Sequence, residues 1–480
     1  MGRETNTDLI KVLEKQIEEG KGNAIKLKRD RNSLLNISKI AIPEILGYIF
    51  VWCLVQEANP PYCCGFDGLP DYSHNFVLVC RHWFEVASRT PEVWSFWGNT
   101  LQDWKKCHHR SRATPLDLVL NGDECDPGVH FDKSLQYAVK SRAVQDTIRQ
   151  VHLRSKNGDT LSSIISALTP DDEGCQGGNI ESIIWLNRGT TLVDASNFFA
   201  RTHLSKLRCL NVSGGFWISS WEGLVSRTTL LTTLSLGVDG SPTTSQLFSL
   251  LTLNPNLQDL HLDIVLPEDI DRSTSRVSLR DLKFLNLTGN LRPLCGLLRR
   301  LILPELDQMG LALSDPTSEG ISQILGPYMQ DYFRRNSRFQ GRLEISPSYT
   351  HYYSTTVTVA NLCPQTTAPM TPSVSLTALL IGVPPATFEQ LSINLFMLMP
   401  RERIVSIDSG LDIKLPEEVF FTMPNVEALY ISGGELFEGF LQPNPEGPHA
   451  YAVRFVQKLT IAKKACFTPN FHKFIGDGRQ

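Results

Sequence analysis

The six residues Leu207-Arg208-Cys209-Leu210-Asn211-Val212 follow the pattern apolar-x-x-apolar-x-apolar. The same pattern returns along the chain in copies that begin at Ile148, Ile180, Leu207, Leu231, Leu257, Leu282, Leu298, Phe388, Val426 and Val456. Apolar residues two positions apart face the same side of a strand, so each copy predicts a short strand with one buried face. A further strand is predicted over Pro115–Leu120.

The central copies are regularly spaced. Their start positions differ by 24 residues from Leu207 to Leu231, by 26 from Leu231 to Leu257 and by 25 from Leu257 to Leu282. This period resembles that of leucine-rich repeats, whose units each supply a strand and a returning element and bury their apolar faces by stacking. Helices are therefore expected between the strands, over Leu192–Leu204 and Ser245–Leu253. The alternative is a set of scattered strands in another kind of α/β protein.

The repeats are irregular. The asparagine that leucine-rich repeats often place three residues after the last apolar position occurs here as Asn290, after Leu287, but not in the neighbouring copies. The stretch Ser346–Thr377 is rich in Ser, Thr, Tyr and Pro, which predicts a surface loop or a disordered insert. The repeat-like region is predicted to span residues 99–480.

Two short stretches nearer the N-terminus predict amphipathic helices. In Ile42–Phe50, Pro43 suits a first helical turn, and Glu44 places negative charge at the positive end of the helix dipole. Both stretches have apolar residues at spacings of three and four, which predicts an apolar helical stripe in each. These residues are Ile42, Ile45, Leu46, Ile49 and Phe50 in the first stretch, and Phe76, Val79, Cys80, Trp83 and Phe84 in the second, with Val86 and Ala87 extending it.

Together these stretches resemble the F-box, the adaptor-binding motif of cullin–RING ubiquitin ligases. The resemblance is carried by Ile42-Pro43-Glu44-Ile45-Leu46, Ile49-Phe50, Val79-Cys80-Arg81-His82-Trp83 and Pro91-Glu92-Val93-Trp94. An insert over about residues 55–75, with Pro60-Pro61 and Cys63-Cys64, departs from the usual short connection. The F-box is thus placed over residues 36–98, after a helical and basic segment over 1–35 in which Gly20 and Gly22 are expected to interrupt the helix.

With Ala113–Leu118 and the irregular repeats, the chain is similar to the large family of basidiomycete fungal F-box proteins. The resemblance implies an α/β fold in which a small helical F-box module precedes an irregular leucine-rich-repeat-like solenoid. It also implies a substrate-recognition subunit of a Skp–cullin–F-box ubiquitin ligase, which binds a Skp-type adaptor, through it a cullin, and a protein substrate on the repeats. The expected adaptor-binding residues are Pro43, Glu44, Ile45, Leu46, Ile49, Phe50, Leu78, Val79, Cys80, Trp83 and Trp94.

A second interpretation is a repeat-based scaffold outside any ligase, in which the F-box-like helices only cap the solenoid. In either case the partner is expected on the exposed strand face. Its outward positions are mixed and weakly charged, so they specify no phosphate-binding or acid-binding partner: Arg208, Asn211, Thr232, Ser235, Gln258, His261, Lys283 and Asn286.

Composition excludes several functional classes. Lys+Arg 46 against Asp+Glu 50 gives a net charge of −4, so no nucleic-acid partner is expected. The apolar window 42–55 is too short to span a membrane, and the N-terminal residues show no secretory signal, which predicts a cytoplasmic or nuclear protein without a membrane partner. Catalytic motifs are missing, and neither Cys107-His108-His109 nor the cysteines around the insert have regular ligand spacing. We therefore expect no enzyme, cofactor or metal site.

Overall fold

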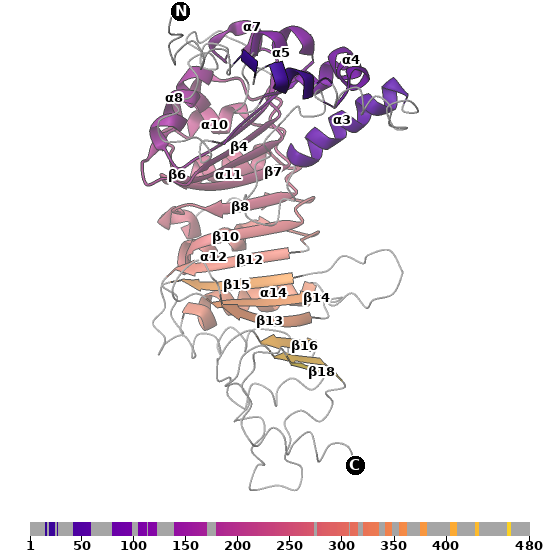
Figure 1. Cartoon of the computed structure of the whole chain (residues 1–480). Coiled ribbons are helices and arrows are strands. Elements are labelled where there is room, and N and C mark those ends of the chain that lie inside the picture. Colours follow the sequence, from indigo (N-terminus) through magenta and orange to yellow (C-terminus); the bar gives the residue numbers. More distant parts are fainter. Residues whose placement is uncertain are drawn as a thin grey trace, which may run out of the picture. The chain divides into compact units, whose positions relative to one another are not determined.

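The computed structural model describes residues 15–16, 19–24, 26, 42–58, 79–97, 104–112, 114–121, 139–169, 179–272, 276–306, 308–314 and 320–335, and the strands 341–347, 355–361, 375–381, 404–409, 428–431 and 458–461. The chain divides into two compact units, Met1–Leu207 and Arg208–Gln480. Each unit combines a largely parallel sheet with helices, so the α/β class expected from the sequence is confirmed (Figure 1).

The first unit begins with helices. Residues 19–24 are helical, so the prediction that Gly20 and Gly22 interrupt the helix is wrong. The elements that follow are α3 (Pro43–Ala58), α4 (Arg81–Arg89), the 3-10 helix η2 (Pro91–Trp94), β1 (Phe96–Trp97) and α5 (Trp104–Ser111). The first four residues of the predicted insert, 55–58, therefore continue α3, and residues 59–78 lie outside the described part.

The sheet of this unit has the order β1-β2-β3-β4, and all its described pairings are parallel. Its strands β2 (Leu116–Asn121), β3 (Ile148–Ser155) and β4 (Ser182–Asn187) fall close to the predicted positions. The unit also contains α7 (Arg142–Gln145), α8 (Gly158–Leu168), β5 (Val193–Asp194) and α9 (Ser196–Arg201). The indole of Trp185 on β4 is buried against Phe198 and Phe199 of α9, with ring centroids 4.9 and 5.7 Å apart.

The second unit repeats a strand followed by a helical element. Its sheet has the order β6-β7-β8-β10-β12-β15-β14-β13-β16-β17-β18. The strands are β6 (Cys209–Trp217), β7 (Thr233–Asp239), β8 (Asp259–Asp263), β10 (Phe284–Asn290), β12 (Gln308–Ser314), β13 (Gly341–Pro347), β14 (Thr355–Asn361), β15 (Ser375–Ile381), β16 (Ile404–Ser409), β17 (Ala428–Ile431) and β18 (Lys458–Ile461). Between and after them lie α10 (Glu222–Arg227), α11 (Thr244–Leu253), η3 (Glu268–Arg272), β9 (Val277–Ser278), α12 (Leu291–Arg300), β11 (Leu301–Ile302), the π-helical turn η4 (Ile321–Leu325) and α14 (Gly326–Arg335).

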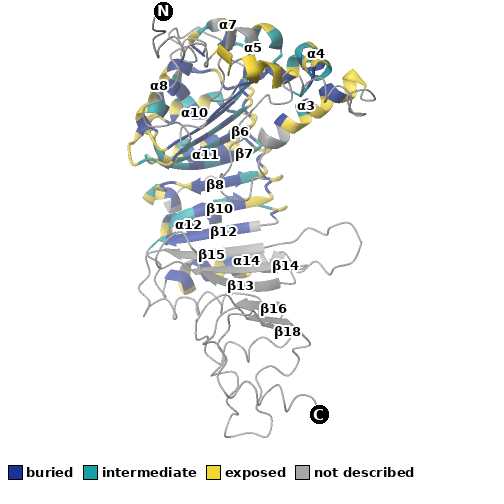
Figure 2. Ribbon diagram, viewed as in Figure 1, coloured by how far each residue is buried: buried dark blue, intermediate teal, exposed yellow. Residues whose placement is uncertain are grey.

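The register explains the sequence period. Leu210, Leu234, Leu260 and Leu285 stand side by side on neighbouring strands, and all four are buried (Figure 2). Each strand starts two residues after the first apolar position of its copy. That first leucine lies in the turn before the strand and is itself buried, in every case from Leu207 to Leu282: Leu207, Leu231, Leu257 and Leu282.

The copy predicted to start at Leu298 is not a strand but mainly the end of α12. The buried leucines of α12 have the helical spacing of three and four, which also satisfies part of the strand pattern; they are Leu291, Leu294, Leu297 and Leu298. The next true copy starts at Leu306, 24 residues after Leu282, and continues with Met309 and Leu311 of β12.

The stretch Ser346–Thr377 contains β14, which pairs antiparallel with both β13 and β15, so part of it is ordered sheet. Its Thr- and Val-rich strand segment, 355–361, has the residue types that favour strands. The copy predicted at Phe388–Ile393 lies outside the described residues, whereas β17 and β18 match the last two copies.

Candidate docking site on the helical module

We call α3, α4 and η2 the helical module. Its interior is formed by one face of α3, which turns Leu46, Phe50 and Leu54 inward at intervals of four residues. Leu46 and Phe50 are only 1% and 2% exposed. The Phe50 ring packs against the indole of Trp83 on α4, with 5.2 Å between ring centroids. Burial of these side chains holds the two helices together.

Close approach of α3 to the end of α4 depends on Gly47. A Cβ at this position would lie 2.9 Å from Thr90 Oγ1, closer than side-chain atoms normally come. The Thr90 hydroxyl is not free to move, because it donates a hydrogen bond of 2.9 Å to the carbonyl of Val86 in the last turn of α4. A glycine on the inward face of α3 therefore permits the packing of these elements.

Two tryptophans join the module to the sheet. The indole N–H of Trp94 donates to the carbonyl of Ala87 at 2.7 Å, and that of Trp97 donates to the carbonyl of Trp94 at 3.1 Å. Phe96 and Trp97 then form β1, which pairs in parallel with β2. The Ala87 carbonyl also accepts from the backbone N–H of Thr90 at 3.2 Å, so the two indole bonds are additional buried hydrogen bonds that tie the end of α4 and η2 to β1.

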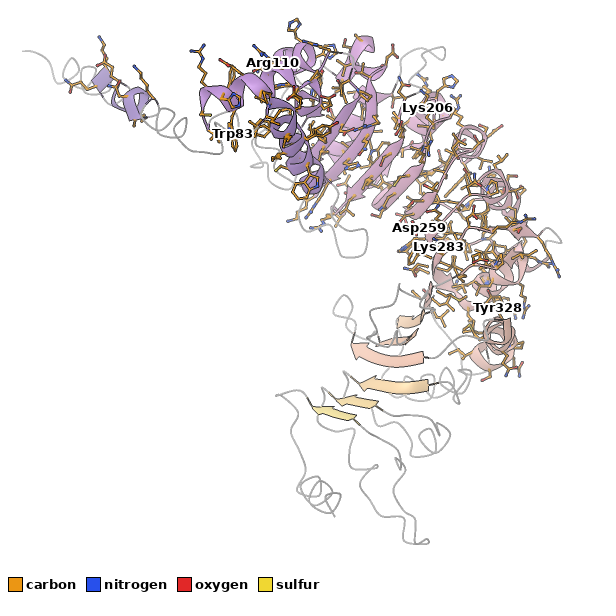
Figure 3. All side chains as sticks on the ribbon, turned by 90° about the vertical axis from the view of Figure 1, so that its right-hand side faces the viewer. Trp83, Arg110, Lys206, Asp259, Lys283 and Tyr328 are labelled. Carbon is orange, nitrogen blue, oxygen red and sulfur yellow. The ribbon has the colours of Figure 1, made fainter. Side chains whose placement is uncertain are left out.

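Arg110 of α5 packs against the module. Its guanidinium carbon lies 4.4 Å from the Trp94 ring centroid and 5.6 Å from the Phe84 ring centroid, so the cation contacts the faces of both rings. Trp83 and Arg110 are labelled in Figure 3. Through these contacts α5 fixes the position of Phe84, which is partly exposed on α4.

The opposite face of α3 is apolar and exposed (Figure 2). We call its residues the outer stripe; they are Ile42, Ile45, Tyr48, Ile49 and Trp52. Ile45, Trp52 and Tyr48 are 52%, 62% and 78% exposed. The helix thus has two apolar faces, of which the module buries only one. A row of large exposed apolar side chains on one helix is typical of a surface that binds a partner.

The structure divides the predicted adaptor-binding residues into three groups. Those exposed at the start and along the outer face of α3 are Pro43, Glu44, Ile45 and Ile49. Those buried in the module, where they support its shape and present no surface, are Leu46, Phe50, Cys80 and Trp94. Those partly exposed at the start of α4 are Val79 and Trp83, and Leu78 lies outside the described residues.

The sequence prediction placed Ile45, Leu46, Ile49 and Phe50 on a single stripe, because a spacing of three and four residues admits both members of each adjacent pair. In the structure Ile45 and Ile49 face outward while Leu46 and Phe50 face inward. The prediction also left Tyr48 and Trp52 out of the apolar stripe, and it left Phe84, which it placed on the second stripe, out of the adaptor-binding residues. For Trp52 a signal was present: it follows Ile45 by seven residues and Ile49 by three, which places all three on one helical face.

No other kind of site was found in the described residues. None of their His, Cys, Asp and Glu side chains form a group of three that could hold a metal ion. In the same residues no helix combines the length and the apolar character needed to cross a bilayer.

Comparisons with known proteins give little further information. No protein-family model matches the chain, and no curated protein is significantly similar to it. The crystal structure of the Rad7 and Elc1 complex in yeast matches 98% of this chain and 97% of that chain, with 10% sequence identity and a TM-score of 0.26. At that TM-score the match supports no conclusion about fold or function.

Proposed function

We propose that this protein is the substrate-recognition subunit of a ubiquitin ligase of the Skp–cullin–F-box type. In this proposal the outer stripe of α3 binds a Skp-type adaptor, and through it a cullin. The leucine-rich-repeat-like sheet holds a protein substrate, and the protein itself catalyses no reaction. The resemblance of the module's sequence to the F-box suggests the partner, and the exposed second face of α3 supplies a surface for it.

The outer stripe is the observation that carries this proposal. Helices that dock in a partner's groove present apolar residues at spacings of three and four, as Ile42, Ile45, Ile49 and Trp52 do here. Binding energy in such interfaces is concentrated in a few large side chains. Ile45, Tyr48 and Trp52 are the most suitable candidates because they are both large and more than half exposed.

A binding assay with a purified recombinant Skp-type adaptor tests the proposal. The double variant Ile45→Ser/Trp52→Ser should weaken binding by at least about 30-fold, the effect of losing interface side chains that each contribute strongly. Both residues are exposed, so the variant should keep its thermal unfolding temperature. The matched control is Leu253→Ser/Val265→Ser, which also removes two exposed apolar side chains and should bind as the parent does.

A scaffold outside any ligase is the second candidate. It is favoured by the pairing of β1 with β2, through which the module covers the first edge of the sheet. A cap of this kind needs only the inward face of α3. Failure of the adaptor to bind, or equal binding by the Ile45→Ser/Trp52→Ser variant, would favour the scaffold. Point variants are preferable to deletion of residues 1–98, because the deletion would also remove β1.

A further inference from the structure

The sheet of the second unit has an outer face, formed by the strand residues that alternate with the buried leucines on β6, β7, β8, β10 and β12. The register aligns these residues into rows across the strands. One row contains Ser213, Gly237, Asp263, Thr288 and Ala312. A neighbouring row contains Asn211, Ser235, His261, Asn286 and Gly310.

The charges on this face are separated along the strands. Arg208 and Lys283 lie just before β6 and β10, whereas Asp239 and Asp263 lie at the opposite ends of β7 and β8. On the five strands the outward positions carry Asp239, Asp259 and Asp263, and none of them carries Lys or Arg. Asp259 is the least available of the three carboxylates, because it accepts a hydrogen bond of 3.1 Å from Thr233 and lies near Lys283 (Figure 3). Asp239 and Asp263 are exposed and form no hydrogen bond or ion pair through their side chains with the described residues.

His261 does not supply the missing positive charge. Its Nδ1 lies 3.3 Å from Nδ2 of Asn286, and burial lowers the pKa of its imidazole, with the nearby Asp263 acting in the opposite direction. The ring is therefore neutral at pH 7. Beside it, Phe284 of β10 is 42% exposed and adds an apolar contact surface to the same face.

Gly237 leaves a gap in the first row. A Cβ built on it would lie 3.4 Å from the Cβ of Ser213 and 3.8 Å from the Cβ of Asp263, which is ordinary contact distance. Because Gly237 has no side chain, its backbone is partly exposed between Ser213 and Asp263. A partner's side chain that lies over Gly237 would meet one hydroxyl and one carboxylate.

We propose that this outer face binds a basic segment of a partner protein, with a lysine or arginine side chain placed over Gly237 beside Asp263. The inference rests on the proposed function, in which the same sheet holds the substrate, and it names the substrate's chemistry. The unmatched carboxylates Asp239 and Asp263 favour a cation electrostatically, and Phe284 contacts the apolar part of the segment.

The proposal can be tested without the adaptor, so its failure is distinguishable from failure of adaptor docking. The full chain is titrated against two fluorescein-labelled peptides by fluorescence anisotropy. One peptide is built of Gly, Ser, Phe and Lys, and the other has Glu at every Lys position. The Lys peptide should bind more tightly than the Glu peptide, and its affinity should fall as salt is raised because the charges are exposed.

Two variants locate the binding. Asp239→Asn/Asp263→Asn should weaken binding of the Lys peptide about five- to tenfold, as expected for two exposed charge pairs. The matched control Glu222→Gln/Glu268→Gln removes the same charge from exposed positions on α10 and η3 and should leave binding unchanged. Gly237→Val fills the gap with a residue that favours strands, so it should reduce binding while the protein keeps its thermal unfolding temperature.

Three results would overturn the proposal. They are binding of the Glu peptide as tight as that of the Lys peptide, no measurable binding of the Lys peptide, and an equal loss of affinity in the Glu222→Gln/Glu268→Gln control.

Discussion

Two asparagines of the second unit differ sharply in what their side chains bind. Asn254, which follows α11, is buried; its Nδ2 donates to the carbonyls of Thr228 at 2.9 Å and Leu250 at 2.8 Å, and its Oδ1 accepts from the Leu231 N–H at 2.9 Å. Asn290, which the repeat pattern singled out, is exposed and its side chain does not cap α12. The repeat spacing does not identify Asn254, because spacing carries no information about which loop is buried.

Replacing Asn254 by Ala should therefore destabilise the protein strongly. The change leaves the buried Leu231 N–H and Thr228 carbonyl without partners, and such groups cost about 1–3 kcal/mol each. We expect the free energy of unfolding in urea to fall by about 2–4 kcal/mol. Asn290→Ala is the matched control and should change it by less than about 0.5 kcal/mol. Equal effects of the two substitutions would contradict this role of Asn254.

His152 of β3 makes stability depend on pH. Burial lowers the pKa of its imidazole to about 4, from the ordinary value of 6.5. Between these values the unfolded chain binds a proton that the folded chain does not, so the contribution of this residue to stability is lost as the pH falls from 6.5 toward 4. Urea unfolding should show a slope of at most about 1.4 kcal/mol per pH unit from this residue.

The variant His152→Gln should have a flatter profile over the same pH range, because the group that takes up the proton on unfolding is gone. Replacing the exposed His203 by Gln controls for removal of an imidazole. A parent slope that persists unchanged in His152→Gln would show that another group is responsible.

At the scale of elements, α3 shows what the sequence could and could not predict. Its start at Pro43 and its helical character follow from local residue preferences, and both were predicted. Which apolar residues face inward depends on the partner element, and here the contact of Gly47 with Thr90 turns Leu46 and Phe50 inward and leaves Ile45 and Ile49 outside. A pattern of apolar positions cannot distinguish these two faces.

Gly47→Ala tests the packing of α3 against Thr90. In an exposed helix this substitution stabilises by about 0.5–1 kcal/mol, since alanine favours helix more than glycine does. Here the added Cβ meets Thr90 Oγ1 at 2.9 Å, so we expect destabilisation by about 1–2 kcal/mol in thermal or urea unfolding.

Thr90→Ala removes the obstructing atoms and supplies the control. The double variant Gly47→Ala/Thr90→Ala should be more stable than the sum of the two single effects predicts, which is the sign of direct contact. Additive effects would mean that the two residues do not interact.

The repeats were predictable for a different reason. Leu207, Leu231, Leu257 and Leu282 are buried in successive turns at nearly constant spacing, so the sequence period records the structure directly. Prediction failed where one pattern serves two elements, as in α12, and the copy at Leu306–Leu311 was missed although Met309 is apolar and fits the pattern. It also failed for β14, whose antiparallel pairing depends on strands far apart in the sequence.

At the scale of the whole molecule, the described part of the first unit joins the helical module to a sheet through continuous hydrogen bonding. Trp94 and Trp97 bond to the ends of α4 and η2, and the backbone N–H of Asp117 on β2 donates to the carbonyl of Ser95 at 2.8 Å. The module is therefore expected to unfold together with the sheet of its unit.

Hydrogen exchange of backbone amides measures this coupling. Amides of α4 and those of β2 and β3 should open with the same free energy, because they belong to one cooperative unit. Trp97→Ala removes a side chain that is 1% exposed between the module and β2 and should lower the opening free energy of both regions equally, by about 3–5 kcal/mol. Trp217→Ala removes an exposed tryptophan and should leave both unchanged. If α4 loses protection while β2 and β3 keep theirs, the module is an independent unit, and the coupling proposed between the module and the sheet of its own unit is wrong.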